Sequence, residues 1–378
     1  MNPAADADDP LSWAMPAIRA LRAYDPGHDL VALRRDYRPA RLLELGANEN
    51  PYGPSPRALE AVSAALGGLH RYPDPRAGDL RRALAEKHAV APSQLVFGNG
   101  SHELLMQLAQ VFAGPGDDVV MSQYGFAVFA IAARAVGANV RIAPALPSGD
   151  PMPRGHDLDA LLGAVTADTR LLYLANPNNP TGTWFTAADF GRFMAALPPR
   201  VVVVVDEAYA ELADAPGFAS ALALLPRHRN LVVTRTFSKA YALAGLRVGY
   251  AVAAPALAAA LERVRESFNL GVPALAAAEA ALADEAHLAA TVAGNARERD
   301  ALAAALRGRG LAVSPSQANF LLVEFGARAA DLDGALLARG VVLRPMAGYG
   351  LPECLRITVG TRDDNRRLLA SLDEVLAA

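Results

Sequence analysis

The sequence predicts an α/β protein of two domains, the larger built on a mostly parallel sheet flanked by helices. Three observations support this: the length of 378 residues, short apolar runs that alternate with helical patterns, and an uninterrupted valine run at 201–205. Strands alternating with helices are typical of βαβ units, whose strands pair in parallel. A chain of this length can form two packed domains with a sizeable core.

The larger domain occupies the middle of the chain in the predicted order. Its expected strands are 95–97, 118–122, 171–175, 201–205, 231–235 and 248–252. Its expected helices are 101–112, 126–136, 187–196 and 219–225. The run 201–205 contains only β-branched residues and no alternation, which predicts a strand buried on both faces. Leu104, Leu105 and Leu108 fall on one face of helix 101–112, as expected for packing on a sheet.

The residue pattern of the sequence changes after about residue 255, where a second, smaller α/β domain is expected. Ala-rich helical patterns cover 255–265 and 274–307. Predicted strands follow at 319–325, 341–344 and 355–359, and a final helix ends the chain. The expected division is a large domain at 47–260 and a discontinuous small domain at 1–46 and 261–378.

Composition excludes several classes of protein. The net charge of −3 and the pI of about 6.2 leave no basic footprint for nucleic acid. Cys354 is the single cysteine, so neither a disulfide framework nor a thiolate metal cage is expected, and the histidines show no ligand spacing. Residues 1–10 lack the features of a signal peptide, and no apolar run of about 18 residues predicts a membrane span. We therefore expect a cytoplasmic protein without a metal, a membrane or a nucleic-acid partner.

Polar residues follow four of the predicted strands. They are Asp206 and Tyr209, then Asn179, then Thr236, Ser238, Lys239 and Arg247, and the turn Gly98-Asn99-Gly100-Ser101. Ligands of open α/β sheets bind at the carboxyl ends of the strands. A Gly-rich turn before a helix suits a phosphate, and a buried carboxylate needs a cationic partner. A lysine in such a site can form a Schiff base. Pyridoxal 5'-phosphate (PLP) carries the groups that such residues bind, namely a phosphate, a pyridinium, a phenolate and an aldehyde.

Simpler interpretations apply to some of these residues taken alone. A dinucleotide fingerprint is disfavoured because Glu103 stands where G-x-G-x-x-G has its third glycine. Residues 178–182 all favour turns, so that segment alone could be structural. A single lysine is usually solvated, but Lys239 lies at a predicted strand end beside an apolar stretch. That context favours a functional role.

Seven segments occur in the order typical of fold-type I PLP-dependent aminotransferases. They are ANENPYGP (47–54), RYPD (71–74), GNGS (98–101), NNPTG (178–182), DEAY (206–209), SK to GLR (238–247) and LRITVGT (355–361). From about Leu21 to the C-terminal helix, the chain resembles this family, and most closely its class II-like histidinol-phosphate aminotransferases. The resemblance implies the fold-type I architecture of a large PLP-binding domain and a smaller α/β domain.

The resemblance also implies roles around the cofactor. Lys239 resembles the lysine that holds PLP as an aldimine and moves the substrate proton, and Asp206 resembles the partner of the pyridine nitrogen. Asn179 and Tyr209 resemble the donors to the phenolate oxygen, and Tyr124 resembles the ring that stacks on the cofactor. The phosphate would be bound by the N–H groups of Ser101 and His102 and by Thr236, Ser238 and Arg247. Tyr72 resembles a tyrosine that reaches the phosphate of the other subunit, which implies a homodimer.

Substrate residues are implied in the same way. Arg356 resembles the arginine that binds the acidic group of the substrate, and Tyr24, Asn50 and Arg344 resemble residues of the phosphorylated donor's site. The implied reaction is ping-pong transamination between histidinol phosphate and 2-oxoglutarate, a step of histidine biosynthesis. An arginine fork serves phosphate and carboxylate alike, so Arg356 does not distinguish the two substrates.

Three alternatives remain at this point. Close relatives transaminate phenylalanine and tyrosine, and a PLP-dependent decarboxylase of a phosphorylated amino acid would keep the same cofactor site. A PLP-binding regulator without turnover is disfavoured, because too few residues precede the resemblance for a helix-turn-helix domain. His102 stands where relatives often carry Asp or Asn, and a side chain facing the substrate would shift the preference.

Overall fold

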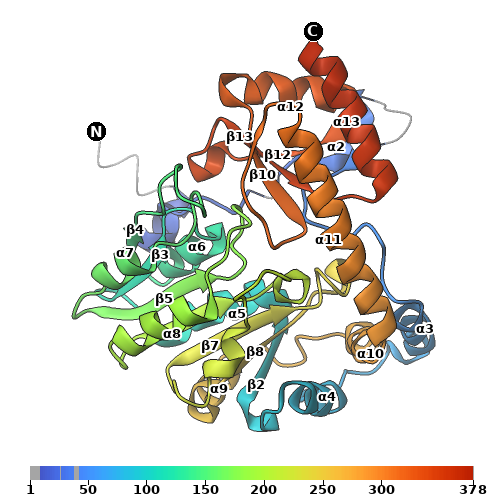
Figure 1. The fold of residues 1–378 in the computed structure, drawn as a ribbon. Coiled ribbons are helices and arrows are strands. Elements are labelled where there is room, and N and C mark those ends of the chain that lie inside the picture. The colour runs from blue at the N-terminus through green and yellow to red at the C-terminus, as the bar shows by residue number, and fades with distance from the viewer. Residues whose placement is uncertain (1–8, 26, 38–41, 378) are drawn as a thin grey trace.

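The computed structural model describes residues 9–25, 27–37 and 42–377 and shows two α/β lobes (Figure 1). The larger lobe contains a seven-stranded sheet of order β2-β8-β7-β6-β5-β3-β4. The smaller lobe contains a four-stranded antiparallel sheet of order β12-β13-β10-β9, and β1 pairs with β11 in parallel beside it. The predicted α/β class with a mostly parallel central sheet is confirmed.

All strands of the large sheet except β4 lie close to predicted positions. They are β2 (Leu95–Asn99), β3 (Asp118–Ser122), β4 (Asn139–Ala143), β5 (Thr169–Ala175), β6 (Val202–Asp206), β7 (Leu231–Thr236) and β8 (Val248–Ala253). Only β8 runs against its neighbours in this sheet. Strands β5, β6 and β7 pair in parallel, so their carboxyl ends meet at one edge. That edge is where the sequence analysis expects the ligand.

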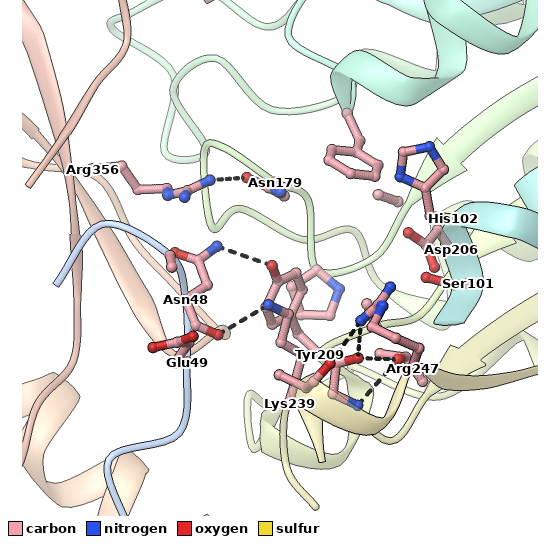
Figure 2. A pocket seen from close by; sticks show the side chains of 18 of the residues that line it. Asn48, Glu49, Ser101, His102, Asn179, Asp206, Tyr209, Lys239, Arg247 and Arg356 are labelled. Atoms are coloured by element: carbon pink, nitrogen blue, oxygen red, sulfur yellow. Dashed lines mark hydrogen bonds between the residues drawn. The ribbon is translucent and has the colours of Figure 1, made fainter. Parts of the chain in front are cut away.

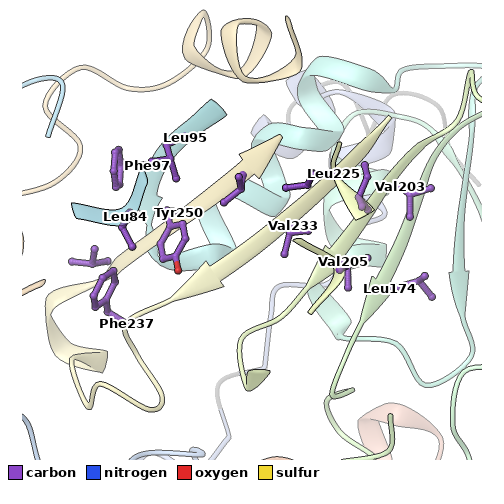
Figure 3. Packing of buried hydrophobic residues seen from close by; sticks show 14 of the residues in the cluster. Leu84, Leu95, Phe97, Leu174, Val203, Val205, Leu225, Val233, Phe237 and Tyr250 are labelled. Atoms are coloured by element: carbon purple, nitrogen blue, oxygen red, sulfur yellow. The ribbon is translucent and has the colours of Figure 1, made fainter. Parts of the chain in front are cut away.

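Helices cover both faces of the large sheet. One face packs against α3 (Pro56–Ala65), α4 (Gly78–His88), α7 (Leu158–Gly163), α8 (Ala187–Ala196) and α10 (Val272–Leu282). The other face packs against α5 (Gly100–Phe112), α6 (Ala127–Ala135) and α9 (Pro255–Glu262). Val203 and Val205 point into the first core (Figure 3), whereas Val202 and Val204 point into the second. The strand predicted from the valine run is therefore buried on both faces, as expected.

The smaller lobe packs helices against its short strands. Its elements are β1 (Leu43–Glu44), α11 (Glu285–Arg307), β9 (Ala312–Val313), β10 (Phe320–Glu324), α12 (Ala329–Ala338), β11 (Val341–Val342), β12 (Arg344–Pro345), β13 (Cys354–Thr358) and α13 (Arg362–Ala377). Two N-terminal helices, α1 (Pro16–Arg19) and α2 (Leu30–Tyr37), precede β1. Leu43 and Leu45 are buried in the same core as α11, α12 and α13, which ties the start of the chain to its end.

The helix predicted at 274–307 is in fact two helices, α10 and α11. The break lies at Asp284, whose side chain caps the start of α11 by accepting a hydrogen bond from the His287 N–H at 3.2 Å. Ser55 Oγ also donates to this carboxylate at 2.5 Å. Both helices are rich in alanine, so the sequence indicates the break between them only through this aspartate.

Two other predictions need correction, and one strand of the large sheet was missed. The strand expected at 341–344 consists of β11 and β12, which belong to different sheets. The helix expected at 219–225 is a single 3-10 turn, Ala221–Leu224, capped by Ser220. Strand β4 was not predicted, because it is an edge strand whose residues are mostly exposed and show no apolar run.

The domain division at 46/47 and 260/261 stays a proposal. Helix α10, which follows residue 260, is buried in the core of the large sheet with α3. Helix α11 contributes instead to the core of the small lobe. These contacts favour placing the boundary between α10 and α11.

Two glycines allow β8 to lie directly against the start of α5. A Cβ on Gly249 would overlap the carbonyl carbon of Gly100 and lie 2.5 Å from the Ser101 nitrogen. Gly100 has φ +74, and a Cβ there would overlap Nη2 of Arg247. The start of α5 can therefore approach β8 and Arg247 only without side chains at these two positions.

We expect Gly249→Ala to destabilise the protein by about 1–3 kcal/mol, because backbone atoms cannot yield to the added methyl group. Urea unfolding followed by circular dichroism measures the change. Gly191→Ala is the matched control, since Gly191 is inside α8 with open space around its Cβ position. A control loss as large as that of Gly249→Ala would contradict the steric explanation.

Candidate active site

A cavity of about 300 Å³ lies where β5, β6 and β7 end, between the two lobes (Figure 2). The residues predicted for the site that line it are Tyr24, Ser101, His102, Asn179, Asp206, Tyr209, Thr236, Ser238, Lys239, Arg247 and Arg356. They come from segments far apart in the sequence. The structure therefore brings most of the predicted site together in one place.

Asp206 is the last residue of β6 and is buried beneath the cavity. Thr234, its pairing neighbour on β7, donates a hydrogen bond to Asp206 Oδ1 at 2.8 Å. Burial raises the pKa of Asp206 to about 6, although the hydrogen bond from Thr234 acts in the opposite direction. A carboxylate in this position is stabilised by a cationic ligand group placed above it.

Lys239 lies three residues after the end of β7 and lines the same cavity. Its Nζ donates to the backbone carbonyl of Asn48 at 3.0 Å, and it lies 5.7 Å from the centre of the Tyr209 ring. Burial, reinforced by the positive charge of Arg356, lowers the pKa of Lys239 to about 8. A lysine with a lowered pKa supplies an unprotonated, nucleophilic amine near neutral pH.

One end of the cavity is rich in hydrogen-bond donors. Arg247 Nη1 donates to Ser238 Oγ at 3.2 Å, and the hydroxyls of Ser238 and Thr236 lie 2.9 Å apart. Helix α5 begins here, and the N–H groups of its first turn have no acceptor within the helix. Glu103, in the same turn, accepts from the Asn99 N–H and caps the helix. A cation, hydroxyls and a helix N-terminus together form an anion site.

Arg356 lies at the other end of the cavity and is 7% exposed. Its Nη1 donates to Asn179 Oδ1 at 2.7 Å and its Nη2 to the Gly46 carbonyl at 2.6 Å, while its buried Nε has no partner. Burial lowers the pKa of Arg356. Within the described ranges, no carboxylate forms an ion pair with this guanidinium. A buried cation without an anion is costly, so this end of the cavity favours an anionic ligand.

Asn48 is a site residue to which the sequence analysis gave no role, although it lies in the quoted segment 47–54. It adopts φ +55, and its Nδ2 donates to Tyr209 Oη at 3.0 Å. Burial raises the pKa of Tyr209, so its hydroxyl stays protonated. Asn319 Nδ2 donates to the Asn48 carbonyl at 3.0 Å and fixes the acceptor of Lys239. These contacts depend on the fold, and no sequence pattern announces them.

Aromatic rings close one side of the cavity, but Tyr124 is not among them. The side chain of Tyr124 packs against Leu322, Met346, Leu351 and Cys354 in the small lobe. Phe126, which was not predicted, lines the cavity in its place. The Tyr24 ring lies edge-on to Phe126 at 6.3 Å and to His102 at 6.0 Å. The side chain of His102 therefore faces the cavity, where burial and Arg247 lower its pKa.

Three other predicted residues also lie outside the cavity lining. Asn50 Nδ2 donates to the carbonyls of Lys239 and Ala240, both at 3.1 Å, and so supports the lysine loop from behind. Arg344 Nη2 donates to the Asp25 carbonyl at 2.6 Å, next to Tyr24. Tyr72 is 82% exposed and stacks on Phe268 with ring centres 4.6 Å apart. The structure does not bring these three to the ligand space of this chain.

A further compositional signal was overlooked. Lys87 and Lys239 are the only lysines in the sequence, although Lys and Arg together number 36. Lys87 is exposed on α4. Lys239 is therefore the single lysine at the cavity, and the count alone could have drawn attention to it.

In the part of the chain that the structure describes, no group of three or more His, Cys, Asp or Glu side chains could hold a metal ion. No helix among those residues is both long and apolar enough to cross a membrane.

The fold and the cavity define a class of protein, and comparison with known families agrees. Residues 40–372 match the family of class I and II aminotransferases. The chain belongs to this family, so the prediction of a transaminase is confirmed.

Particular relatives within the family are histidinol-phosphate aminotransferases. Proteins named histidinol-phosphate aminotransferase 2 are 47% identical in Methylococcus capsulatus, over 96% of this chain and 98% of that protein, and 45% identical in Pseudomonas aeruginosa, over 98% and 99%. The crystal structure of the Sinorhizobium meliloti histidinol-phosphate aminotransferase, in complex with PLP, superposes with a TM-score of 0.87. That protein is 33% identical, over 97% of this chain and 98% of its own. The resemblance found from the motifs is thereby confirmed.

The lowered pKa of Lys239 predicts its chemical reactivity. In the cofactor-free protein, we expect acetic anhydride to modify Lys239 with a half-maximal rate at about pH 8, because only the unprotonated amine reacts. Peptide mass spectrometry of samples labelled across a pH series measures the profile. Lys87 in the same samples is the internal reference. A Lys239 profile at higher pH than that of Lys87 would contradict the effect of burial.

Proposed function

We propose that this protein is a PLP-dependent aminotransferase that moves the amino group of L-histidinol phosphate to 2-oxoglutarate, a step of histidine biosynthesis. One observation carries the proposal: a lysine with a lowered pKa, a buried carboxylate and a buried arginine without a counter-ion line one cavity. The relatives named above support the choice of donor.

The cavity fits PLP at both of its charged ends. We assign the cofactor phosphate to the start of α5 at Ser101 and His102, and to Thr236, Ser238 and Arg247, which gather at the donor-rich end. We assign the pyridine nitrogen to Asp206, and the phenolate oxygen to Asn179 and Tyr209. Bound PLP supplies an aldehyde that takes up the amino group and a ring that accepts electrons.

Lys239 is assigned two tasks, to hold the cofactor covalently and then to move a proton. Its pKa of about 8 is close to neutral pH, so the amine can both accept and return a proton. The Asn48 carbonyl at 3.0 Å orients Nζ from the side of the small lobe. Asn50 holds the backbone of Lys239 and is therefore a positioning residue rather than a substrate ligand.

Arg356 is assigned to the acidic group of each substrate in turn. The phosphate of the donor and a carboxylate of the acceptor would both satisfy its unpartnered Nε and its charge. Asn179 contacts Arg356 at 2.7 Å, so one residue touches both the guanidinium and the space assigned to the cofactor. Tyr24 lines the cavity, so we assign it to direct contact with the donor. Arg344 binds the carbonyl of the adjacent Asp25, so we assign it to positioning Tyr24.

We also propose a homodimer in which Tyr72 reaches the cofactor phosphate of the partner subunit. The support is the exposure of Tyr72 and Phe268 together, which leaves a stacked aromatic pair on the surface of the single chain. The cytoplasmic location expected from the sequence stays a prediction.

A second donor class is favoured by one specific observation. Tyr24, His102 and Phe126 place three rings on one side of the cavity, which suits a planar side chain. Such a surface would accept the imidazole of histidinol phosphate or the ring of phenylalanine or tyrosine. Aromatic amino-acid transamination is therefore the competing function.

The decisive experiment adds one donor at a time to the holoenzyme without a keto acid. We expect L-histidinol phosphate to abolish the visible absorbance of the bound cofactor within one turnover, because the amino group is transferred to it. 2-Oxoglutarate should then restore the band. A band that responds to phenylalanine but not to histidinol phosphate would replace the proposed donor with the aromatic one.

A trapping experiment tests the role of Lys239 separately. Borohydride reduction of the holoenzyme should attach the cofactor to the peptide containing Lys239, as read by mass spectrometry. Lys87→Arg should leave this label in place, whereas Lys239→Ala should lose both the label and turnover, by at least about a thousandfold. A label on Lys87, or turnover of Lys239→Ala near that of the wild type, would overturn the assignment.

A further inference from the structure

A buried cluster of charged side chains lies beside the ends of β6 and β7. Glu207 is completely buried, and Arg235 of β7 is nearly so. Arg235 Nε and Nη2 lie 2.9 and 2.7 Å from Glu207 Oε2, and Nη1 donates to Glu211 Oε1 at 2.8 Å. None of these three residues lines the catalytic cavity. The chemistry proposed for the cavity uses none of them.

The carboxylate of Glu207 is hydrogen-bonded through both of its oxygens. Ser220 Oγ donates to Glu207 Oε2 at 2.7 Å and accepts from Arg235 Nη2 at 2.9 Å. The Ala221 N–H donates to Glu207 Oε1 at 2.6 Å. A buried polar network whose members are hydrogen-bonded makes the segments that it joins more rigid.

Two other titratable groups near Arg235 are neutral. Tyr250 pairs with Arg235 across β7 and β8, and its Oη contacts His88 Nε2 at 2.7 Å. Burial raises the pKa of Tyr250, whereas burial and the charge of Arg235 lower the pKa of His88 to about 4. Near neutral pH, the charge of Arg235 is therefore balanced by Glu207 and Glu211, which lie within ion-pair distance.

The two glutamates flank Tyr209 in the sequence. Glu207 lies two residues before Tyr209, and Glu211 lies two residues after it, in the 3-10 turn Ala210–Leu212. Tyr209 is buried and lines the cavity, where its Oη accepts from Asn48 Nδ2 at 3.0 Å. One guanidinium therefore binds both ends of the short segment that carries the Tyr209 ring.

The same two strands support Asp206 at the neighbouring position. The Glu207 N–H donates to the Thr234 carbonyl at 2.9 Å, which continues the pairing of β6 with β7 one residue beyond Asp206. Thr234 binds the Asp206 side chain, and the next residue, Arg235, binds the Glu207 side chain. Consecutive residues of a strand point to opposite faces. Asp206 is thus supported on the face of the cavity, and the Tyr209 segment on the face behind it.

We propose that Arg235 is a positioning residue, which keeps the Tyr209 hydroxyl at the cavity by fixing the segment 207–211 at both ends. Loss of the Glu211 carboxylate would leave this segment fixed at one end, so the Tyr209 hydroxyl would occupy its position for less of the time. The effect on the cofactor rests on the proposed function, which assigns Tyr209 to the phenolate oxygen. The fixing of the segment does not depend on that assignment.

A pH titration of the visible absorbance of the holoenzyme tests the effect without any substrate. A hydrogen bond to the phenolate oxygen contributes to the pH at which the absorbance band changes. Glu211→Ala should shift this midpoint in the same direction as Tyr209→Phe but by less, about 0.3–1 pH unit. Glu211→Gln keeps an acceptor for Arg235, so its midpoint should lie between those of the wild type and Glu211→Ala.

A double variant tests whether the effect passes through Tyr209. Tyr209→Phe/Glu211→Ala should have the midpoint of Tyr209→Phe alone, because both changes act on one hydroxyl. A Glu211→Ala midpoint equal to that of the wild type, or a shift that adds in full to that of Tyr209→Phe, would overturn the proposal. If Glu211→Ala does not fold, Glu211→Gln decides by the same two criteria.

Glu262→Ala is the matched control. Glu262 accepts from Arg265 Nε at 2.7 Å and from Arg81 Nη2 at 3.1 Å, so it is also a carboxylate bound by arginine. It ends α9 and does not line the catalytic cavity. Its midpoint should equal that of the wild type. A midpoint shift in Glu262→Ala as large as that in Glu211→Ala would show a general effect of losing an ion pair and would overturn the proposal.

Amide hydrogen exchange of the cofactor-free protein separates this inference from the proposed function. The segment 207–212 contains two backbone hydrogen bonds, of 3.2 and 3.0 Å. Its amides should exchange about three- to tenfold faster in Glu211→Ala and at the wild-type rate in Glu262→Ala. Unchanged exchange in Glu211→Ala would overturn the fixing of the segment. A midpoint unchanged in Tyr209→Phe would instead remove Tyr209 from the phenolate oxygen, and the exchange rates would still decide whether Arg235 fixes the segment.

Discussion

Asn48 connects the two lobes at the point where the amine lies. Its carbonyl accepts from Lys239 of the large lobe and from Asn319 of the small lobe, both at 3.0 Å. Its amide nitrogen donates to Tyr209, and its backbone N–H donates to Thr358. A single residue with a left-handed backbone conformation therefore fixes the lysine, the tyrosine and the last strand of the small sheet relative to one another.

The buried charges of the cavity explain why this contact matters. Asp206, Lys239 and Arg356 are each held where water is scarce, and burial shifts the pKa of each toward its neutral form. No pair among them forms an ion pair in the described structure. Such a site costs stability, and it lies at the edge of a sheet whose valine strand is buried in the two cores of the large lobe. A ligand that brings a cationic ring nitrogen and an anionic group would restore the balance.

The parts of this arrangement that the sequence predicted are those set by local pattern. The valine run predicts β6, and β6 delivers Asp206 to the edge of the sheet. Lys239 and Arg247 follow in the same way from the end of β7. The parts that could not be predicted depend on register and on contacts between distant segments. Thr234 supports Asp206 only because β7 pairs with β6 in one register, and Phe126 replaces Tyr124 at the cavity because the Tyr124 ring packs on the small lobe.

The scarcity of lysine limits the positions at which free PLP can attach covalently to the protein. PLP is an aldehyde that condenses with any accessible primary amine, whereas an arginine guanidinium stays charged and does not compete for it. Apart from Lys87, the cationic side chains outside the cavity are arginines, so the surface offers almost nothing to which free PLP can attach unproductively. Nearly every molecule of cofactor that this chain captures covalently is thus directed to Lys239.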